Sequence, residues 1–141
     1  MTKLNTDSDA LQSRILAHDK LAEKDVNDWI FEISKPELAG NVLDIGCGTG
    51  KQTLPLSEKI KEGGKVIGVD LSEESLQFIR DSSHRENIIT VKADIDSFFD
   101  KLPFTGFDLI QSCFAIYYSK QQVALLNKLF DILNTSGSVF I

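Results

Sequence analysis

The sequence contains only two cysteines, Cys47 and Cys113, among its 141 residues. Two thiols are too few for a disulfide framework, and no group of cysteines or histidines has the spacing of metal ligands. We therefore expect no structural metal. Long apolar runs are also lacking, which excludes a membrane-spanning helix and a membrane partner. The N-terminal stretch MTKLNTDSDALQSR has no basic start, apolar stretch and small-residue cleavage site in succession, so no secretory signal is visible and we expect a cytoplasmic location.

Basic residues are scarce as well. Fifteen lysines and arginines stand against twenty-one acidic residues, which gives a formal net charge of −6. No tract of basic residues forms a stripe that could neutralise phosphates, so we expect no nucleic-acid partner. The hydrophobic fraction of 42% is enough for the single core of one globular domain.

The most informative feature that is present is the stretch VLDIGCGTG, residues 42–50. It predicts a short buried strand that runs into glycines at alternate positions, which allow a tight turn and a close approach to a ligand. Asp70 stands twenty positions after Gly50, at the end of the next apolar run, VIGVD. A carboxylate at the tip of a neighbouring strand can accept hydrogen bonds from both ribose hydroxyls, so the pair indicates a nucleoside cofactor site.

The spacing excludes two other phosphate-binding loops. The dinucleotide-binding motif G-x-G-x-x-G is not matched. Lys51 stands at the position of its third glycine when the motif is counted from Gly46, and Thr53 stands there when it is counted from Gly48. A P-loop fails because Ile45 stands where its first glycine would be and Gln52 where its Ser or Thr would be.

The remaining pattern, D-x-G-x-G-x-G with Asp44 inside the strand, resembles the first motif of the class I S-adenosylmethionine-dependent methyltransferases. The segments that follow support this resemblance in order, from VIGVD and IITVKADID to FDLIQSCFAIYY and GSVFI. The resemblance implies S-adenosyl-L-methionine as cofactor and S-adenosyl-L-homocysteine as product. It implies the following cofactor-binding residues: Asp44, Gly46, Cys47, Gly48, Gly50, Asp70, Leu71, Asp94, Ile95 and Ser112. The catalytic residues stay unknown at this stage.

The order of the segments predicts an α/β fold, with a doubly wound, mostly parallel sheet and helices on both faces. Apolar runs such as VIGV are typical of strands that are covered on both sides. Two helices are expected to have a core-facing apolar stripe. In the helix of residues 24–35 the stripe holds Val26, Trp29, Ile30 and Ile33, and in that of residues 120–133 it holds Val123, Leu126, Phe130 and Leu133. Ser72 has the position of a helix N-cap.

The expected domains are an N-terminal helical extension or lid, residues 1–36, and a cofactor-binding Rossmann-like domain, residues 37–141. The resemblance implies further antiparallel strands that this sequence lacks, so we expect a missing C-terminal segment or an oligomer to cover the last strand. The Asn/Asp-Pro-Pro-Tyr signature of enzymes that methylate exocyclic amines is absent after the fourth strand, which favours a small-molecule acceptor. An aminopropyltransferase-like enzyme and a non-catalytic cofactor-binding module remain as alternatives.

Overall fold

The computed structural model describes residue 16 and residues 25–141 of the chain. The chain divides into two compact units, residues 1–33 and residues 34–141. The predicted N-terminal lid falls largely on residues 1–15 and 17–24, which lie outside the described residues. In the described part of the chain, no helix is long and apolar enough to cross a membrane.

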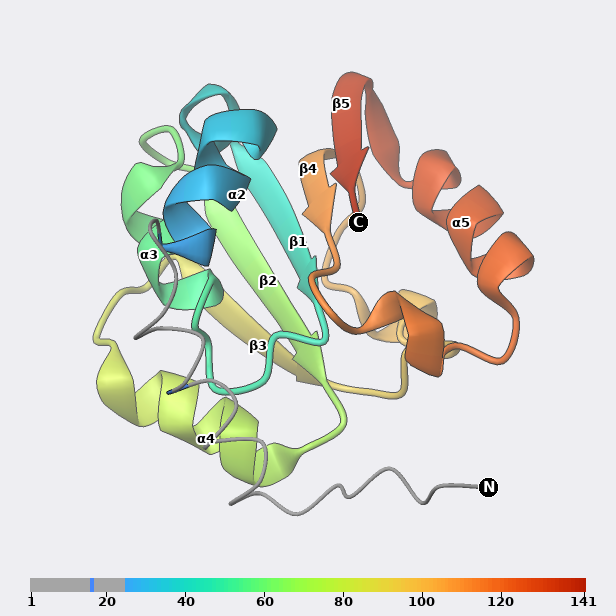
Figure 1. The fold of residues 1–141 in the computed structure, drawn as a ribbon, viewed down its shortest axis with the longest axis horizontal. Coiled ribbons are helices and arrows are strands. Elements are labelled where there is room, and N and C mark those ends of the chain that lie inside the picture. The colour runs from blue at the N-terminus through green and yellow to red at the C-terminus, as the bar shows by residue number, and fades with distance from the viewer. Residues whose placement is uncertain (1–15, 17–24) are drawn as a thin grey trace. The chain divides into compact units, whose positions relative to one another are not determined.

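The second unit is built on a five-stranded sheet with the strand order β3-β2-β1-β4-β5 (Figure 1). All of its neighbouring strands run parallel. The strands are β1 (Asn41–Ile45), β2 (Lys65–Asp70), β3 (Ile88–Lys92), β4 (Phe107–Gln111) and β5 (Leu133–Phe140). The predicted doubly wound α/β fold is therefore confirmed.

Helices cover both faces of this sheet. Alternate residues of β1 point to opposite sides, so Leu43 and Ile45 face one layer while Asp44 faces the other. The first layer holds α5 (Gln122–Asp131), whose Leu125 and Leu129 join the main core cluster. The second layer holds α3 (Thr53–Lys59) and α4 (Glu73–Ser82), on the other side of the sheet in Figure 1.

Local signals in the sequence explain where these helices begin. The predicted N-cap is confirmed, because the Ser72 hydroxyl accepts a hydrogen bond from the Ser75 amide. Glu73 and Glu74 follow in the first turn of α4, where the helix dipole favours negative charge. Pro55 lies in the first turn of α3, where no intrahelical donor is lost.

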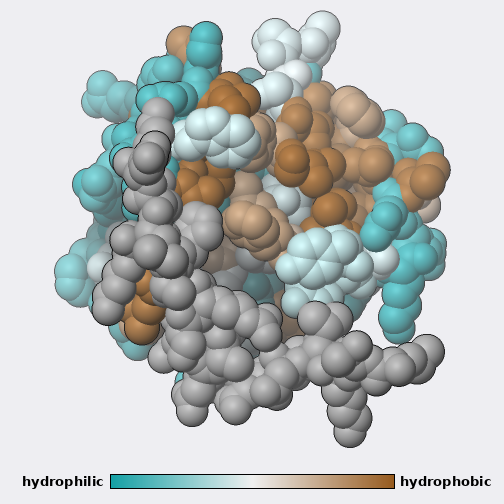
Figure 2. Space-filling model, in the orientation of Figure 1, coloured by the Kyte–Doolittle hydropathy of each residue, from teal (hydrophilic) through white to brown (hydrophobic). Residues whose placement is uncertain are grey.

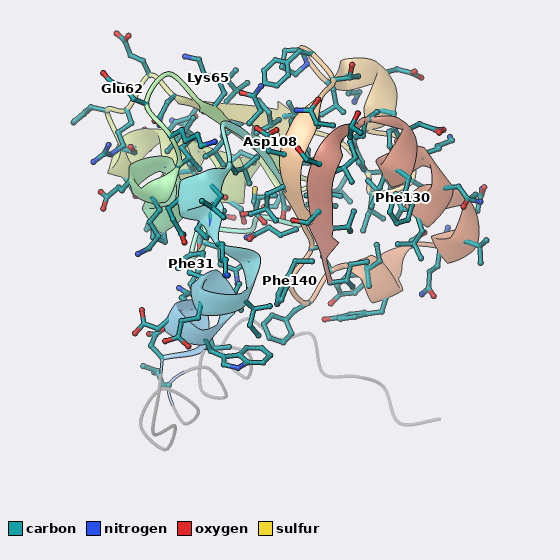
Figure 3. The ribbon with its side chains drawn as sticks, turned by 90° about the horizontal axis from the view of Figure 1, so that it is seen from above. Phe31, Glu62, Lys65, Asp108, Phe130 and Phe140 are labelled. Carbon is teal, nitrogen blue, oxygen red and sulfur yellow. The ribbon has the colours of Figure 1, made fainter. Side chains whose placement is uncertain are left out.

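The amino ends of the strands are closed by a carboxylate. Asp108 Oδ2 accepts hydrogen bonds from the Gly40 and Asn41 amides, at 2.8 and 3.0 Å, and Oδ1 accepts one from Asn134 Nδ2. Figure 3 shows Asp108 at this edge, with Glu62 and Lys65 near the turn that precedes β2. These bonds lower the pKa of Asp108, with the Asn134 bond as the largest cause. This edge is thus held together by the chain itself.

The predicted core face of α5 is wrong for Val123 and Phe130, although Leu126 does pack against the core. Val123 and Phe130 are 75% and 62% exposed, whereas Leu125 and Leu129 are buried and Leu126 is half-buried. The helix carries two apolar stripes, and spacing alone does not decide which of them meets the sheet. Figure 2 shows apolar surface gathered on the side of the molecule where β4, β5 and α5 lie.

The predicted face of the N-terminal helix is right for Ile30 and wrong for Trp29 and Ile33. Helix α2 (Val26–Ser34) buries Ile30 and Phe31, while Trp29 and Ile33 are about half exposed. Its apolar residues surround most of the helix, so several faces fit the same pattern. The helix stops before Pro36, as expected, and the 3-10 turn η1 (Pro36–Leu38) follows.

The fifth strand begins earlier than the segment GSVFI indicates. Leu133 stands opposite Phe107, but Ser138 stands opposite Leu109, so the register shifts between these pairs. The polar residues 134–136 lie in this irregular stretch, which explains why an apolar run does not reveal them as a strand.

Candidate functional site

The candidate site lies at the carboxyl ends of the strands, where the strand order reverses between β1 and β4. Parallel α/β sheets bind ligands at such a switch point, because the loops after the two strands diverge there. The predicted residues Asp44 and Asp70 belong to neighbouring strands at this edge, and Ser112 follows β4. The structure therefore brings together the parts of the site that the sequence placed far apart.

The glycine loop that follows β1 turns towards β2. The Gly46 and Cys47 amides both donate to the Val69 carbonyl, at 2.8 and 3.0 Å. Gly46 has a φ of 71°, and a side chain there would overlap Ala115 Cβ, so only glycine fits. Gly48 has a φ of 50°, but in the described part of the chain no atom lies within 4 Å of the place of its missing Cβ. The loop is thus tightly packed at the missing Cβ of Gly46, and it leaves open space at the missing Cβ of Gly48.

Asp70 connects the glycine loop with the end of β2. Its Oδ2 accepts a hydrogen bond from the Gly48 amide at 2.8 Å, and its Oδ1 accepts one from the Ser72 amide at 2.9 Å. Each carboxylate oxygen has a second lone pair, so the group can still accept bonds from two hydroxyls. Asp70 therefore holds the loop in place and keeps the capacity to bind a ribose.

Asp44 lies buried below the loop in a small polar network. Its Oδ2 accepts a bond from Thr53 Oγ1 at 2.6 Å, and its Oδ1 lies 3.4 Å from Gln111 Nε2. Burial raises the pKa of Asp44 to about 6, the negative charge of Asp70 adds to this, and the Thr53 and Gln111 bonds oppose it. A buried carboxyl with this pKa changes its charge in response to a bound cation or a small change in pH.

Gln111 is a member of this network that sequence reasoning missed. It lies opposite Asp44 in the pairing of β1 with β4, and its side chain is fully buried. Its Nε2 also lies 3.2 Å from Gln52 Oε1. Its own Oε1 has no hydrogen-bond partner among the described residues, so the network has room for one more donor. A polar residue inside the apolar run FDLI-Q was the available signal.

The remaining predicted residues lie in different surroundings. Leu71, next to Asp70 in the chain, is 65% exposed. Asp94 Oδ1 accepts a bond from the Asp96 amide and so forms a local turn, while Ile95 packs partly against the main core. This bond occupies one carboxylate oxygen of Asp94, so its cofactor contact stays a prediction.

The two cysteines and Ser112 fill the space around the loop. Cys47 is buried against Gly68, and burial raises the pKa of its thiol. Burial also raises the pKa of Cys113, to about 11, so both thiols are protonated at neutral pH. The Ser112 hydroxyl donates to the Ile45 carbonyl at 3.3 Å. Within the described residues, no three His, Cys, Asp or Glu side chains are grouped to hold a metal.

The segment between β4 and α5 carries exposed aromatic residues past the same edge. Phe114 is 71% exposed and has a φ of 65°, which costs a bulky residue about 1–2 kcal/mol. Tyr117 and Tyr118, in the 3-10 turn η3 (Ile116–Tyr118), are 59% and 68% exposed, with ring centroids 4.6 Å apart. Partial burial, and then the neighbouring Tyr118, raises the pKa of Tyr117, which keeps its hydroxyl protonated.

A parallel sheet with this strand order, a glycine loop after its first strand and an acidic residue after its second defines a Rossmann-like nucleoside-binding domain. Comparison with known proteins makes this class more specific. Residues 37–141 match the family described as "Methyltransferase domain". The chain belongs to this family of methyltransferase domains.

Individual relatives agree with this family. The chain is 35% identical over 118 residues to the putative methyltransferase YqeM of Bacillus subtilis. The match covers 79% of this chain and 40% of that protein. It is 27% identical over 111 residues to aklanonic acid methyltransferase DauC of a Streptomyces species, covering 78% of this chain and 50% of that protein. The chain thus spans half or less of the length of these relatives.

A solved structure gives the same result for the fold. The S-adenosylmethionine-dependent methyltransferase of Mesorhizobium loti superposes with a TM-score of 0.67 at 27% identity. The match covers 82% of this chain and 53% of that one.

Proposed function

We propose that this chain is the S-adenosylmethionine-binding part of a methyltransferase that acts on a small-molecule acceptor. The observation that carries the proposal is the meeting of the glycine loop and Asp70 at the carboxyl ends of β1 and β2, beside the switch point of the sheet, with open space at Gly48. The name of the relative that methylates aklanonic acid supports a small-molecule acceptor. We also propose a cytoplasmic setting, which the unpaired Cys47 and Cys113 favour.

The residues fit such a cofactor. Asp70 has lone pairs for the ribose hydroxyls, and Leu71 is exposed beside it to cover the adenine. The open space beside Gly48 leaves room for the amino-acid end of the cofactor at the glycine loop. Asp44 and the unpartnered oxygen of Gln111 suit an ammonium group or a water that it orders.

The bound cofactor would supply an electrophilic methyl group on a sulfonium with a good leaving group. The chain's own residues then bind, orient and exclude water, and no covalent nucleophile is required. Asp70 fixes the ribose end, and the glycine loop fixes the amino-acid end. The segment after β4 forms the adjacent surface, where an acceptor can approach.

Calorimetric titration with S-adenosylhomocysteine tests the proposal. Asp70→Ala removes two charge-assisted acceptors, each worth about 1.5–3 kcal/mol, so we expect affinity to fall by roughly a hundredfold or more. Asp70→Asn keeps one acceptor and should lie between Asp70→Ala and the wild type. Gly48→Val fills the open space and should also weaken binding. Asp100→Ala, which removes an exposed carboxylate elsewhere, is the charge-matched control and should bind normally.

The same titration separates the alternatives. Preference for decarboxylated S-adenosylmethionine over the intact compound would favour an aminopropyltransferase-like enzyme. Binding without methyl transfer to any acceptor would favour a non-catalytic module. Wild-type affinity in both Asp70→Ala and Gly48→Val would show that the cofactor site is assigned wrongly.

A further inference from the structure

The exposed aromatic side chains Phe114, Tyr117 and Tyr118, here called the aromatic cluster, are the largest feature near the site that the proposed cofactor does not use. All three follow β4 within the short segment 112–120. Exposed apolar side chains gathered in one short segment are typical of a binding surface, whereas single ones are common anywhere on a protein.

The segment that carries the aromatic cluster is anchored to the cofactor edge at its beginning. Ser112 Oγ donates to the Ile45 carbonyl, and the Ser112 amide donates to the Phe140 carbonyl at 3.0 Å. Ala115 packs so closely on Gly46 that no side chain fits there. The backbone of this segment is therefore packed against the glycine loop at Ala115, next to Phe114 in the chain.

The segment is also anchored at its end. The Ser119 hydroxyl and the Lys120 amide both donate to the Asp96 carboxylate, and the Ser119 bond lowers the pKa of Asp96. With both ends held, the backbone places Phe114 in a left-handed conformation that leaves its ring outside. A bulky residue in this conformation is found where the surrounding structure imposes it, commonly at functional sites.

The chemistry of the aromatic cluster selects a class of ligand. Three ring faces favour a flat, unsaturated ring system, because offset stacking adds to the effect of buried area. The hydroxyls of Tyr117 and Tyr118 can donate hydrogen bonds to an oxygen of that ring system.

We propose that the aromatic cluster is the acceptor-binding surface of this domain and that the acceptor is a planar, unsaturated ring compound. This inference rests on the proposed function, because it places the acceptor beside the proposed cofactor. The ring stacks on the aromatic cluster, and its oxygen or nitrogen substituent points towards the cofactor edge formed by Gly46 and Ser112.

The test uses two probes of similar size, 2-naphthol and its saturated counterpart decahydro-2-naphthol, titrated into the chain in the presence of S-adenosylhomocysteine. Stacking predicts that 2-naphthol binds roughly fivefold or more tightly than the saturated probe. Phe114→Gly should weaken 2-naphthol binding to a similar degree. Because glycine adopts a positive φ without strain, the same variant should be as stable as the wild type or more stable.

Phe130→Ala is the matched control, since Phe130 is a similarly exposed phenylalanine on α5, outside the aromatic cluster. It should leave 2-naphthol binding unchanged. Tyr118→Leu keeps apolar bulk and should weaken only the aromatic probe. S-adenosylhomocysteine affinity should stay at the wild-type value in Phe114→Gly.

Equal binding of the two probes, or no binding of either, would overturn the inference. So would a loss of 2-naphthol affinity in Phe130→Ala as large as that in Phe114→Gly, or a change of oligomeric state in Phe114→Gly. The last result would assign the aromatic cluster to a contact between copies of the chain. If the wild type binds S-adenosylhomocysteine and these results appear, the inference alone fails. If the wild type does not bind S-adenosylhomocysteine, the proposed function fails first.

Discussion

At the scale of single residues, the buried Asp44 carboxyl shows how one position combines stability and function. It lies next to Thr53 and Gln111, yet burial outweighs these hydrogen bonds and raises its pKa to about 6. The folded chain therefore holds a destabilised charge at neutral pH. A cationic ligand group near Asp44 would relieve that cost, which links binding to the protonation state.

This cost predicts a pH dependence of stability. In the unfolded chain Asp44 titrates near its ordinary pKa of 3.8, and in the folded chain near about 6. Between these values the folded state binds more protons, so the free energy of unfolding falls as the pH rises, by at most about 3 kcal/mol for this group.

Urea unfolding of the wild type and Asp44→Asn from about pH 4 to about pH 7 measures this effect. The variant has no titrating group at this position, so the difference between the two proteins isolates Asp44 from groups such as Asp96 and Asp108, whose pKa values are lowered. The wild type should lose stability relative to the variant as the pH rises. A difference that stays constant over this range would contradict the account.

At the scale of helices and strands, the sequence predicts the order of elements better than the faces they bury. The glycine loop, Ser72 and Pro36 each mark an element boundary through local chemistry, and the structure has the boundaries there or close by. The buried face of α5 depends instead on which of two apolar stripes meets the sheet, a long-range contact that local spacing does not contain. Gln111 was missed for the same reason, because its role arises only from its pairing with Asp44.

The buried face of α5 can be tested by two substitutions on one helix. Leu129→Ala removes a fully buried side chain from the main core cluster and should lower the free energy of unfolding by about 2–5 kcal/mol. Val123→Ala, on the exposed stripe, should change it by about 0.5 kcal/mol or less. Denaturant unfolding measures both, and a larger effect of Val123→Ala would restore the face that the sequence predicted.

At the scale of the whole molecule, the main core belongs to one unit. The members of the main cluster lie between Leu43 and Val139, all within the unit of residues 34–141. The predicted boundary between an N-terminal extension and a cofactor-binding domain at residues 36 and 37 stays a prediction. Strand order and the position of the site follow from this unit alone.

A protein of residues 34–141 should accordingly fold by itself. Every described member of the main core cluster lies within that range, so we expect a single cooperative thermal transition with fixed side-chain packing. Scanning calorimetry and near-ultraviolet circular dichroism measure these properties. A gradual transition without near-ultraviolet signal would show that residues 1–33 are needed for the core.

The central claim is that the carboxyl ends of β1 and β2 form the cofactor site, and a crystal structure of the chain with S-adenosylhomocysteine tests it most directly. The account predicts the ribose hydroxyls within hydrogen-bond distance of Asp70 and the amino-acid end of the ligand over Gly48. Ligand density at another edge of the sheet, or none at saturating concentration, would contradict it.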